Sequence, residues 1–62
     1  MEILYASYLG PDRADVKNGK IYEVMQLKDT SIFYGAKDDS GEWYAYPKES
    51  FRLIDLGGDS NE

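Results

Sequence analysis

Short runs of hydrophobic residues alternate with polar turn segments along this chain. The first run covers residues 3–9 and ends at Gly10-Pro11, where a turn is expected. Its Tyr and Ile residues are good strand formers, so the run predicts a strand. We expect the face of this strand that carries Leu4 and Ala6 to point inward.

The rest of the chain predicts four further strands separated by turn signals. The strands are expected at Lys20–Lys28, Ile32–Lys37, Glu42–Tyr46 and Phe51–Asp55. Asn18-Gly19 and Asp38-Asp39-Ser40-Gly41 are typical turn sequences, because Asn, Asp and Gly tolerate the backbone angles of tight turns. Pro47 has no N–H donor, so residues 47–50 are expected to end the fourth strand with a 3₁₀ turn.

Two segments leave room for other interpretations. The apolar residues of 21–28 nearly fit a helix, but the neighbouring turns favour a strand. The polar connector of residues 10–19 alternates charged residues with Ala14 and Val16, which we expect to tuck under the sheet edge. Its charged residues are expected to face water: Asp12, Arg13, Asp15 and Lys17.

Five short strands in so short a chain suggest one all-β domain, a small five-stranded barrel with one 3₁₀ turn before the last strand. Closing the sheet would limit the exposed edges that a flat sheet must protect. We expect the barrel to occupy residues 1–56. Residues 57–62 are Gly-rich and polar, which predicts a flexible C-terminal tail.

The order of these segments resembles an SH3 domain. The sequence Lys17-Asn18-Gly19-Lys20-Ile21-Tyr22-Glu23-Val24 is similar to the K-x-G-x-x-x-x-V pattern at the start of that family's second strand. The hairpin at residues 38–41 and the turn at Pro47-Lys48-Glu49-Ser50-Phe51 are similar to two further family features. The resemblance implies an SH3-like barrel over about residues 3–55.

A second resemblance is to short uncharacterised proteins of Gram-positive bacteria and their phages. It is carried by the pattern GKxYEV, which begins at Gly19, and by DxGExYxYPxxxF, which runs from Asp39 to Phe51. Those proteins are predicted SH3-like barrels. The resemblance therefore implies a fold and a bacterial or phage source, and it implies no activity.

The chain departs from SH3 domains that bind proline-rich peptides. Such domains hold a polyproline helix in a groove of stacked aromatic side chains. The groove Trp would fall near Phe33 or Tyr34, and the groove Tyr of the closing turn falls on Ser50. Pro47 and the acids Asp12 and Asp15 do match the groove pattern, so the groove is incomplete and binding of proline-rich peptides is not expected.

The composition argues against an enzyme. The chain of 62 residues contains neither Cys nor His, which removes thiolate metal sites and the commonest general base. Asp38 and Asp39 are adjacent in a tight turn and make a poor acid–base pair, so a solvated hairpin tip is expected there. We therefore predict no catalytic residue, no metal site and no cofactor.

The charge of −5 limits the classes of partner. Nucleic acid is disfavoured, because its binding depends on neutralising phosphates. No apolar run reaches the ~20 residues that span a bilayer, and the first residues do not resemble a signal peptide. The cytoplasm is the expected compartment, and a basic protein is the expected partner.

The nine aromatic residues point to a protein-interaction surface. In the run Trp43-Tyr44-Ala45-Tyr46, two side chains face one way and two the other, so both sets cannot be wholly buried in a small barrel. An outward set would form an exposed aromatic patch with Tyr8 and Tyr34. The residues predicted to bind a partner are Tyr8, Asp12, Asp15, Tyr34, Trp43 and Pro47.

The leading hypothesis is therefore a non-enzymatic protein-interaction module. One alternative is a small structural protein that forms a homodimer through an edge strand or an aromatic face. Another is an acidic phage-type inhibitor of a host enzyme that acts on nucleic acid. Light scattering at two concentrations distinguishes the homodimer from a monomeric module.

Overall fold

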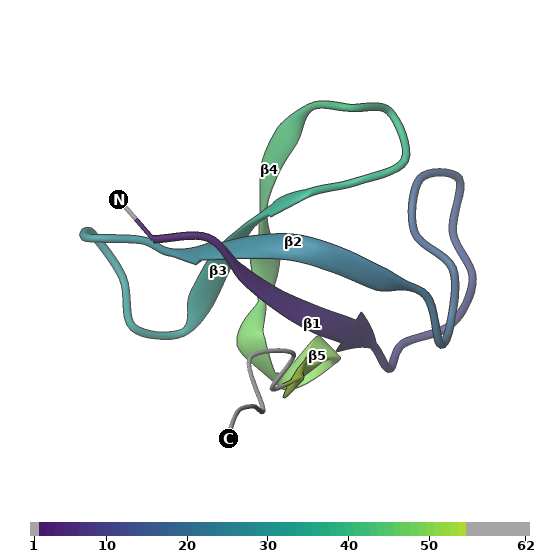
Figure 1. The fold of residues 1–62 in the computed structure, drawn as a ribbon, viewed down its shortest axis with the longest axis horizontal. Coiled ribbons are helices and arrows are strands. Elements are labelled where there is room, and N and C mark those ends of the chain that lie inside the picture. The colour runs from purple at the N-terminus through teal and green to yellow at the C-terminus, as the bar shows by residue number, and fades with distance from the viewer. Residues whose placement is uncertain (1, 55–62) are drawn as a thin grey trace, which may run out of the picture.

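Five antiparallel strands form one sheet in the computed structural model, which describes residues 2–54 (Figure 1). In chain order the elements are β1 (Leu4–Tyr8), β2 (Ile21–Gln26), β3 (Phe33–Lys37), β4 (Trp43–Pro47), the 3₁₀ turn η1 (Lys48–Ser50) and β5 (Phe51–Ile54). The all-β prediction with five strands and one 3₁₀ turn is confirmed. Residues 21–26 form a strand and not a helix. The predicted tail at 57–62 and the predicted strand end at Asp55 lie outside the described residues.

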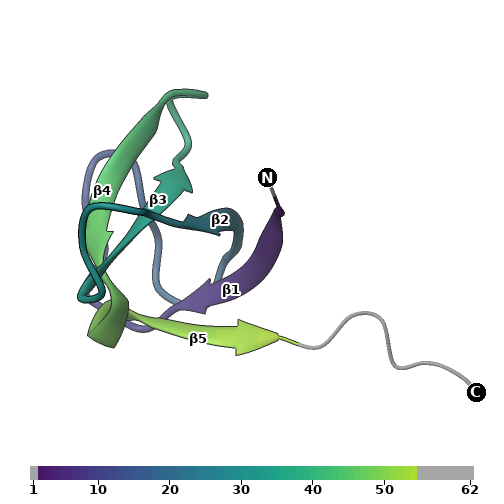
Figure 2. The ribbon, with the colours of Figure 1, turned by 90° about the vertical axis from the view of Figure 1, so that its left-hand side faces the viewer.

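The strands lie in the order β4-β3-β2-β1-β5, and the sheet curls around its concave face (Figure 2). β4 and β5 are connected through η1, yet they form the two opposite edges of the sheet. Within residues 2–54 the two edges do not pair with each other. The sheet is therefore open, and closure into a barrel stays a prediction.

The core lies on the concave face. Its buried members are Ala6, Tyr8, Val16, Tyr22, Val24, Tyr34, Ala36 and Phe51, with Leu4 and Tyr46 packed against them. The predicted inward face of β1 is thereby confirmed. The ring of Phe51 lies near its centre, with ring centroids 5.5 to 6.4 Å from those of Tyr8, Tyr22, Tyr34 and Tyr46.

The connector of residues 10–19 folds back against the β3–β4 hairpin (Figure 1). The Asp39 N–H donates to the Asp15 carbonyl at 2.8 Å, which joins the two segments. Val16 is buried as predicted, whereas Ala14 is exposed. Gly19 has a φ of 84°, which explains why glycine follows Asn18 at this turn.

Pro47 corrects the predicted end of the fourth strand, because it is the last residue of β4 itself. The β3–β4 ladder explains why proline is tolerated there. The Lys48 N–H donates to the Ile32 carbonyl and the Asp38 N–H to the Glu42 carbonyl. Since hydrogen-bonded pairs alternate in an antiparallel ladder, the backbone of Pro47 faces away from β3, where a missing N–H costs no ladder bond.

Over residues 2–54, the structure contains no helix with the length and apolar character that crossing a membrane requires.

Candidate functional site

The exposed apolar residues of β4 lie along an edge of the sheet to which no other strand of residues 2–54 pairs. Trp43 is 39% exposed, Tyr44 is 56% exposed, and Ala45 and Pro47 are also exposed. We call these four residues the β4 surface. Tyr44 and Tyr46 pair with the buried residues Ala36 and Tyr34 and so share their concave face. The side chains on the outer face of β4 are therefore those of Trp43, Ala45 and Pro47.

The β4 surface also presents unpaired backbone groups. The ladder alternation that orients Pro47 also turns the N–H and C=O groups of Trp43 and Ala45 away from β3. Among the described residues, no hydrogen bond involves these groups. β4 therefore offers both main-chain bonding groups and aromatic side chains to a partner.

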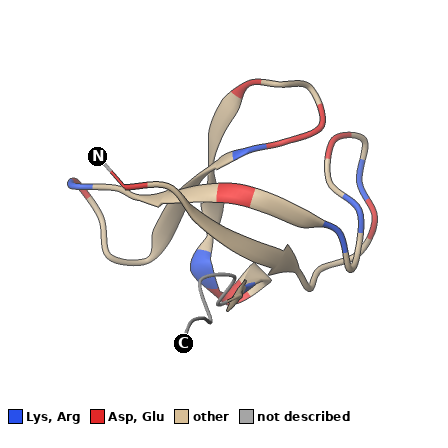
Figure 3. Cartoon of the chain, viewed as in Figure 1, with Lys and Arg blue, Asp and Glu red and all other residues tan. Residues whose placement is uncertain are grey.

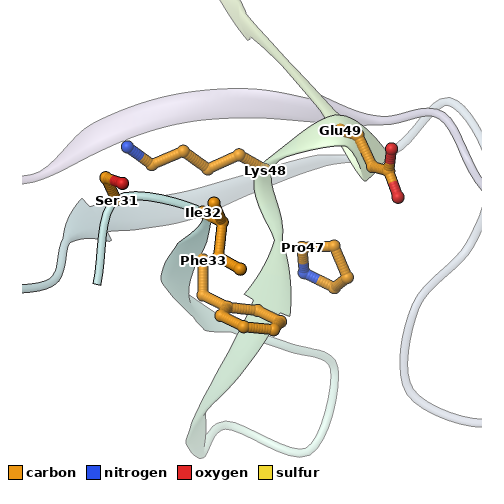
Figure 4. A pocket seen from close by; sticks show the side chains of 6 residues that line it. All are labelled: Ser31, Ile32, Phe33, Pro47, Lys48 and Glu49. Atoms are coloured by element: carbon orange, nitrogen blue, oxygen red, sulfur yellow. The ribbon is translucent and has the colours of Figure 1, made fainter. Parts of the chain in front are cut away.

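An apolar hollow of about 500 Å³ lies beside the C-terminal end of β4 (Figure 4). Phe33 and Pro47 are cross-strand partners on its floor, and the 65% exposed Ile32 lies next to them. The remaining residues that line it are Ser31, Lys48 and Glu49. The Lys48 ammonium lies 5.0 Å from the centroid of the Tyr34 ring, which anchors this side of the hollow by a cation–π contact.

A smaller hollow of about 300 Å³ lies on the other side of Pro47, next to the connector of residues 10–19. Its lining residues are Tyr8, Arg13, Ala45, Tyr46, Pro47 and Ser50. Two positions that the sequence resemblance compares with a peptide groove, Pro47 and Ser50, are among these residues. Ser50 lines it in place of the expected aromatic residue, so its walls are less aromatic than those of a polyproline groove.

Two of the predicted partner-binding residues lie in the core. The prediction that they belong to an exposed aromatic patch is therefore wrong. Tyr8 is 3% exposed and Tyr34 is 8% exposed. Both lie on the concave face, where their rings pack against Phe51. Trp43 and Pro47 do share an exposed face of β4, and their part in binding a partner stays a prediction.

The two predicted acidic residues differ in their surroundings. An oxygen of the Asp12 carboxylate accepts a hydrogen bond of 2.8 Å from the Asn18 N–H, so Asp12 braces the connector. Asn18 in turn donates to the carbonyls of Leu9 and Gly10. Asp15 is exposed, and its carbonyl accepts a hydrogen bond of 2.8 Å from the Asp39 N–H in the turn between β3 and β4. Asp15 therefore lies beside the turn that leads into β4.

The hairpin tip was expected to be solvated, and this prediction is wrong for Asp38, which is only 6% exposed. Its carboxylate accepts hydrogen bonds from the Ser40 N–H, the Ser40 hydroxyl and the Tyr46 hydroxyl. Burial acts to raise the pKa of Asp38, but these hydrogen bonds outweigh it and hold the pKa below its ordinary value. Asp38 therefore stays ionised at neutral pH and stabilises the hairpin.

The neighbouring Asp39 forms an ion pair with Lys20 and accepts a hydrogen bond of 3.0 Å from the Tyr22 hydroxyl. The hydrogen bond from Lys20 is the main cause that lowers the pKa of Asp39, and the same bond raises the pKa of Lys20. A carboxyl group that acts as a general acid at neutral pH needs a raised pKa. The pKa values of Asp38 and Asp39 are both lowered, which is the opposite direction. Within residues 2–54, no three His, Cys, Asp or Glu side chains gather in a way that could hold a metal ion.

Comparison of the chain with protein-family models, curated proteins and solved structures gave no match.

Sequence reasoning missed two parts of this site. Tyr44 is the most exposed aromatic residue on β4, although it shares the concave face with Tyr46. The hollow at Ile32, Phe33 and Pro47 joins residues that are far apart in the chain. The alternation within residues 43–46 signalled one exposed pair of side chains, but nothing in the sequence signalled the hollow.

Proposed function

We propose that this protein is a non-enzymatic protein-interaction module that contacts a protein partner through the β4 surface. The observation that carries the proposal is the free edge of β4, where Trp43 and Tyr44 are exposed beside unpaired backbone groups. Trp and Tyr contribute large contact areas and are enriched among the residues that dominate binding energy. Exposed strand edges also bind extended segments of other proteins through main-chain hydrogen bonds.

The scaffold of this module is an SH3-like small barrel. The strand order, the long connector after β1 and the 3₁₀ turn before β5 support this proposal. The hollow between the connector and Pro47 supports it further, since Pro47 and Ser50, two positions that the resemblance compares with a peptide groove, line it. The incomplete aromatic lining favours a partner held along β4 over one held as a polyproline helix.

The charge distribution favours a moderate electrostatic contribution to binding. Residues 2–54 contain nine Asp and Glu against seven Lys and Arg, a net charge of −2, and Figure 3 shows both signs spread over the loops and strands. The remaining negative charge belongs to residues 55–62. A basic partner in the cytoplasm is then attracted by exposed acidic residues such as Asp15, and its binding weakens as salt rises.

The proposal is tested by selecting ligands from a display library of random peptides and comparing variants. Peptides selected on the wild-type protein should lose at least about tenfold in affinity for Trp43→Ala, because truncating an interface Trp removes a large contact area. Leu53→Ser is the matched control, since Leu53 is 50% exposed on β5, at the opposite edge. Trp43 is the only Trp, so its fluorescence follows binding in the wild-type protein and in Leu53→Ser, and a fluorescent label on the peptide follows binding to Trp43→Ala. Equal losses for both variants, or no selected peptide, would contradict the proposal.

A further inference from the structure

We propose that the free edge of β4 pairs with the β4 edge of a second copy of this chain. The pairing is antiparallel, and its two-fold axis passes through the Ala45 position. The inference rests on the proposed function, because it names an occupant of the same β4 surface. A partner strand from another protein would then have to displace the second copy.

The backbone groups of the edge are self-complementary around Ala45. In this register the Ala45 N–H of each copy donates to the Ala45 carbonyl of the other. The Trp43 N–H of each copy donates to the Pro47 carbonyl of the other. Pro47 lacks an N–H, so no outward N–H is left without an acceptor, while the Trp43 carbonyl of each copy faces Pro47 of the other and receives no hydrogen bond. Each outward-pointing N–H of β4 is thereby hydrogen-bonded.

The outer-face side chains also fit this register. Trp43 of one copy lies opposite Pro47 of the other, because these positions are equally far from Ala45. Phe33 is the cross-strand neighbour of Pro47 on the same face, and both line the apolar hollow of about 500 Å³. The half-exposed indole of Trp43 would therefore lie over the hollow of the second copy (Figure 4). Burying this surface supplies the apolar part of the contact.

The pairing register centred at Ala45 is favoured over the registers centred at adjacent residues. The small size of the Ala45 side chain and the position of Trp43 relative to the hollow decide this. Ala45 is the smallest side chain on β4, so two copies of it meet at the axis without crowding. A register centred at Tyr44 would place Trp43 against Ala45 and leave the hollow uncovered. On the concave face, the register at Ala45 places Tyr44 against Tyr46, and such cross-strand aromatic pairs are favourable.

Charge complementarity supports the same arrangement. β4 itself contains no charged residue (Figure 3), so the two copies do not repel each other along the edge. Glu42 precedes the strand and Lys48 follows it. Because 42 and 48 are equally far from 45, Glu42 of each copy lies opposite Lys48 of the other. Opposite charges therefore face each other at both ends of the pairing.

Sedimentation equilibrium of charge variants at Ala45 tests this arrangement. The wild-type protein should form dimers that dissociate on dilution. Ala45→Lys and Ala45→Glu each place like charges directly across the axis and should raise the dimer dissociation constant at least about tenfold. An equimolar mixture of the two variants should restore dimers, because Lys then faces Glu. Ile21→Lys is the matched control, since Ile21 is 47% exposed on β2, away from the edge.

Amide hydrogen exchange on the wild-type protein tests the edge without a substitution. The Trp43 and Ala45 amides should exchange more slowly as the protein concentration rises. The Leu53 amide should not change, because it faces outward from the opposite edge by the same alternation of the β1–β5 ladder. A monomer at all concentrations, unchanged Trp43 and Ala45 exchange, or a variant mixture that stays monomeric would overturn the dimer.

The two proposals fail in different ways. A monomer that still selects peptides through Trp43 overturns the dimer and leaves the interaction module standing. A dimer that shows the charge-variant behaviour but selects no peptide supports the pairing and contradicts the binding of other proteins at this surface.

Discussion

The hydroxyl of Tyr46 donates a hydrogen bond of 2.7 Å to Oδ2 of Asp38. This bond connects the first residue after β3 to the next-to-last residue of β4 on the concave side of the sheet. It involves a carboxylate that is almost wholly buried. A buried charge that loses a hydrogen bond is costly, so this contact stabilises the strand that carries the β4 surface.

We expect Tyr46→Phe to lower the free energy of unfolding by about 1–3 kcal/mol, because the variant removes one donor to a buried carboxylate. Urea denaturation measures the change. Tyr44→Phe is the matched control, since Tyr44 is exposed and its hydroxyl makes no hydrogen bond among the described residues. Similar losses in both variants would show that the hydroxyl bond to Asp38 contributes little.

Stability should fall in acid as Asp38 and Asp39 become protonated. Hydrogen bonds hold the folded-state pKa of both carboxyl groups below the ordinary value of 3.8, and for Asp38 they do so against burial. A carboxyl group whose pKa is lower in the folded state than in the unfolded state stabilises the fold at pH values above its unfolded-state pKa. This contribution is lost as the pH falls through the folded-state pKa. The free energy of unfolding should therefore decrease below about pH 4. Asp38→Asn should flatten this decrease, and an unchanged slope in that variant would contradict the assignment.

Phe51 should be the most sensitive core position, because its ring contacts four Tyr rings. Phe51→Ala is expected to cost about 3–5 kcal/mol, the range for removing a buried aromatic side chain. A domain of this size has little stability to spare, so the variant should be largely unfolded at room temperature. Circular dichroism checks this, with Phe51→Leu as the milder control. A folded Phe51→Ala with wild-type stability would refute the central role of this ring.

Gly10 should not tolerate a side chain, because it packs closely on Tyr8. A Cβ atom at Gly10 would lie 2.5 Å from the Tyr8 hydroxyl oxygen and 2.7 Å from Cζ. The Tyr8 ring is packed in the core, so relieving the clash disturbs that packing, and Gly10→Ala should cost about 1–3 kcal/mol.

Thermal denaturation in a double-mutant cycle tests the cause of the Gly10→Ala loss. Adding Tyr8→Phe removes the hydroxyl that the new Cβ meets and should recover part of the stability. Strictly additive losses would show that the clash with this hydroxyl is not the cause. Leu9→Ala is the neighbouring control, since Leu9 is 52% exposed.

Local signals predicted the strands well and their ends less well. Gly19 and Gly41, with φ of 84° and 85°, end turns that were recognisable from the Asn, Asp and Gly sequence alone. Pro47 was expected to follow the fourth strand, but it completes β4. Whether proline can occupy a strand depends on which way its backbone faces, and only the pairing with β3 decides that.

The candidate site was predicted in part. Alternation places Tyr8 on the same side of β1 as Leu4 and Ala6, so its burial was implied by the strand phase. The burial of Tyr34 depends on Phe51, which comes from a distant part of the chain. Trp43 and Tyr44 were correctly placed on opposite faces of a strand. Both are exposed because β4 lies at an edge of the sheet, where neither face is fully covered.

The sequence by itself determined the all-β class, the number of strands and the turns between them. These depend on residue preferences and on a two-residue period, which act over a few neighbours. The tertiary structure alone decided that β4 is a free edge, that Asp38 is buried by Tyr46, and that Ile32, Phe33 and Pro47 form one hollow. These features arise from strand order and cross-strand register, which bring together residues that no local pattern connects.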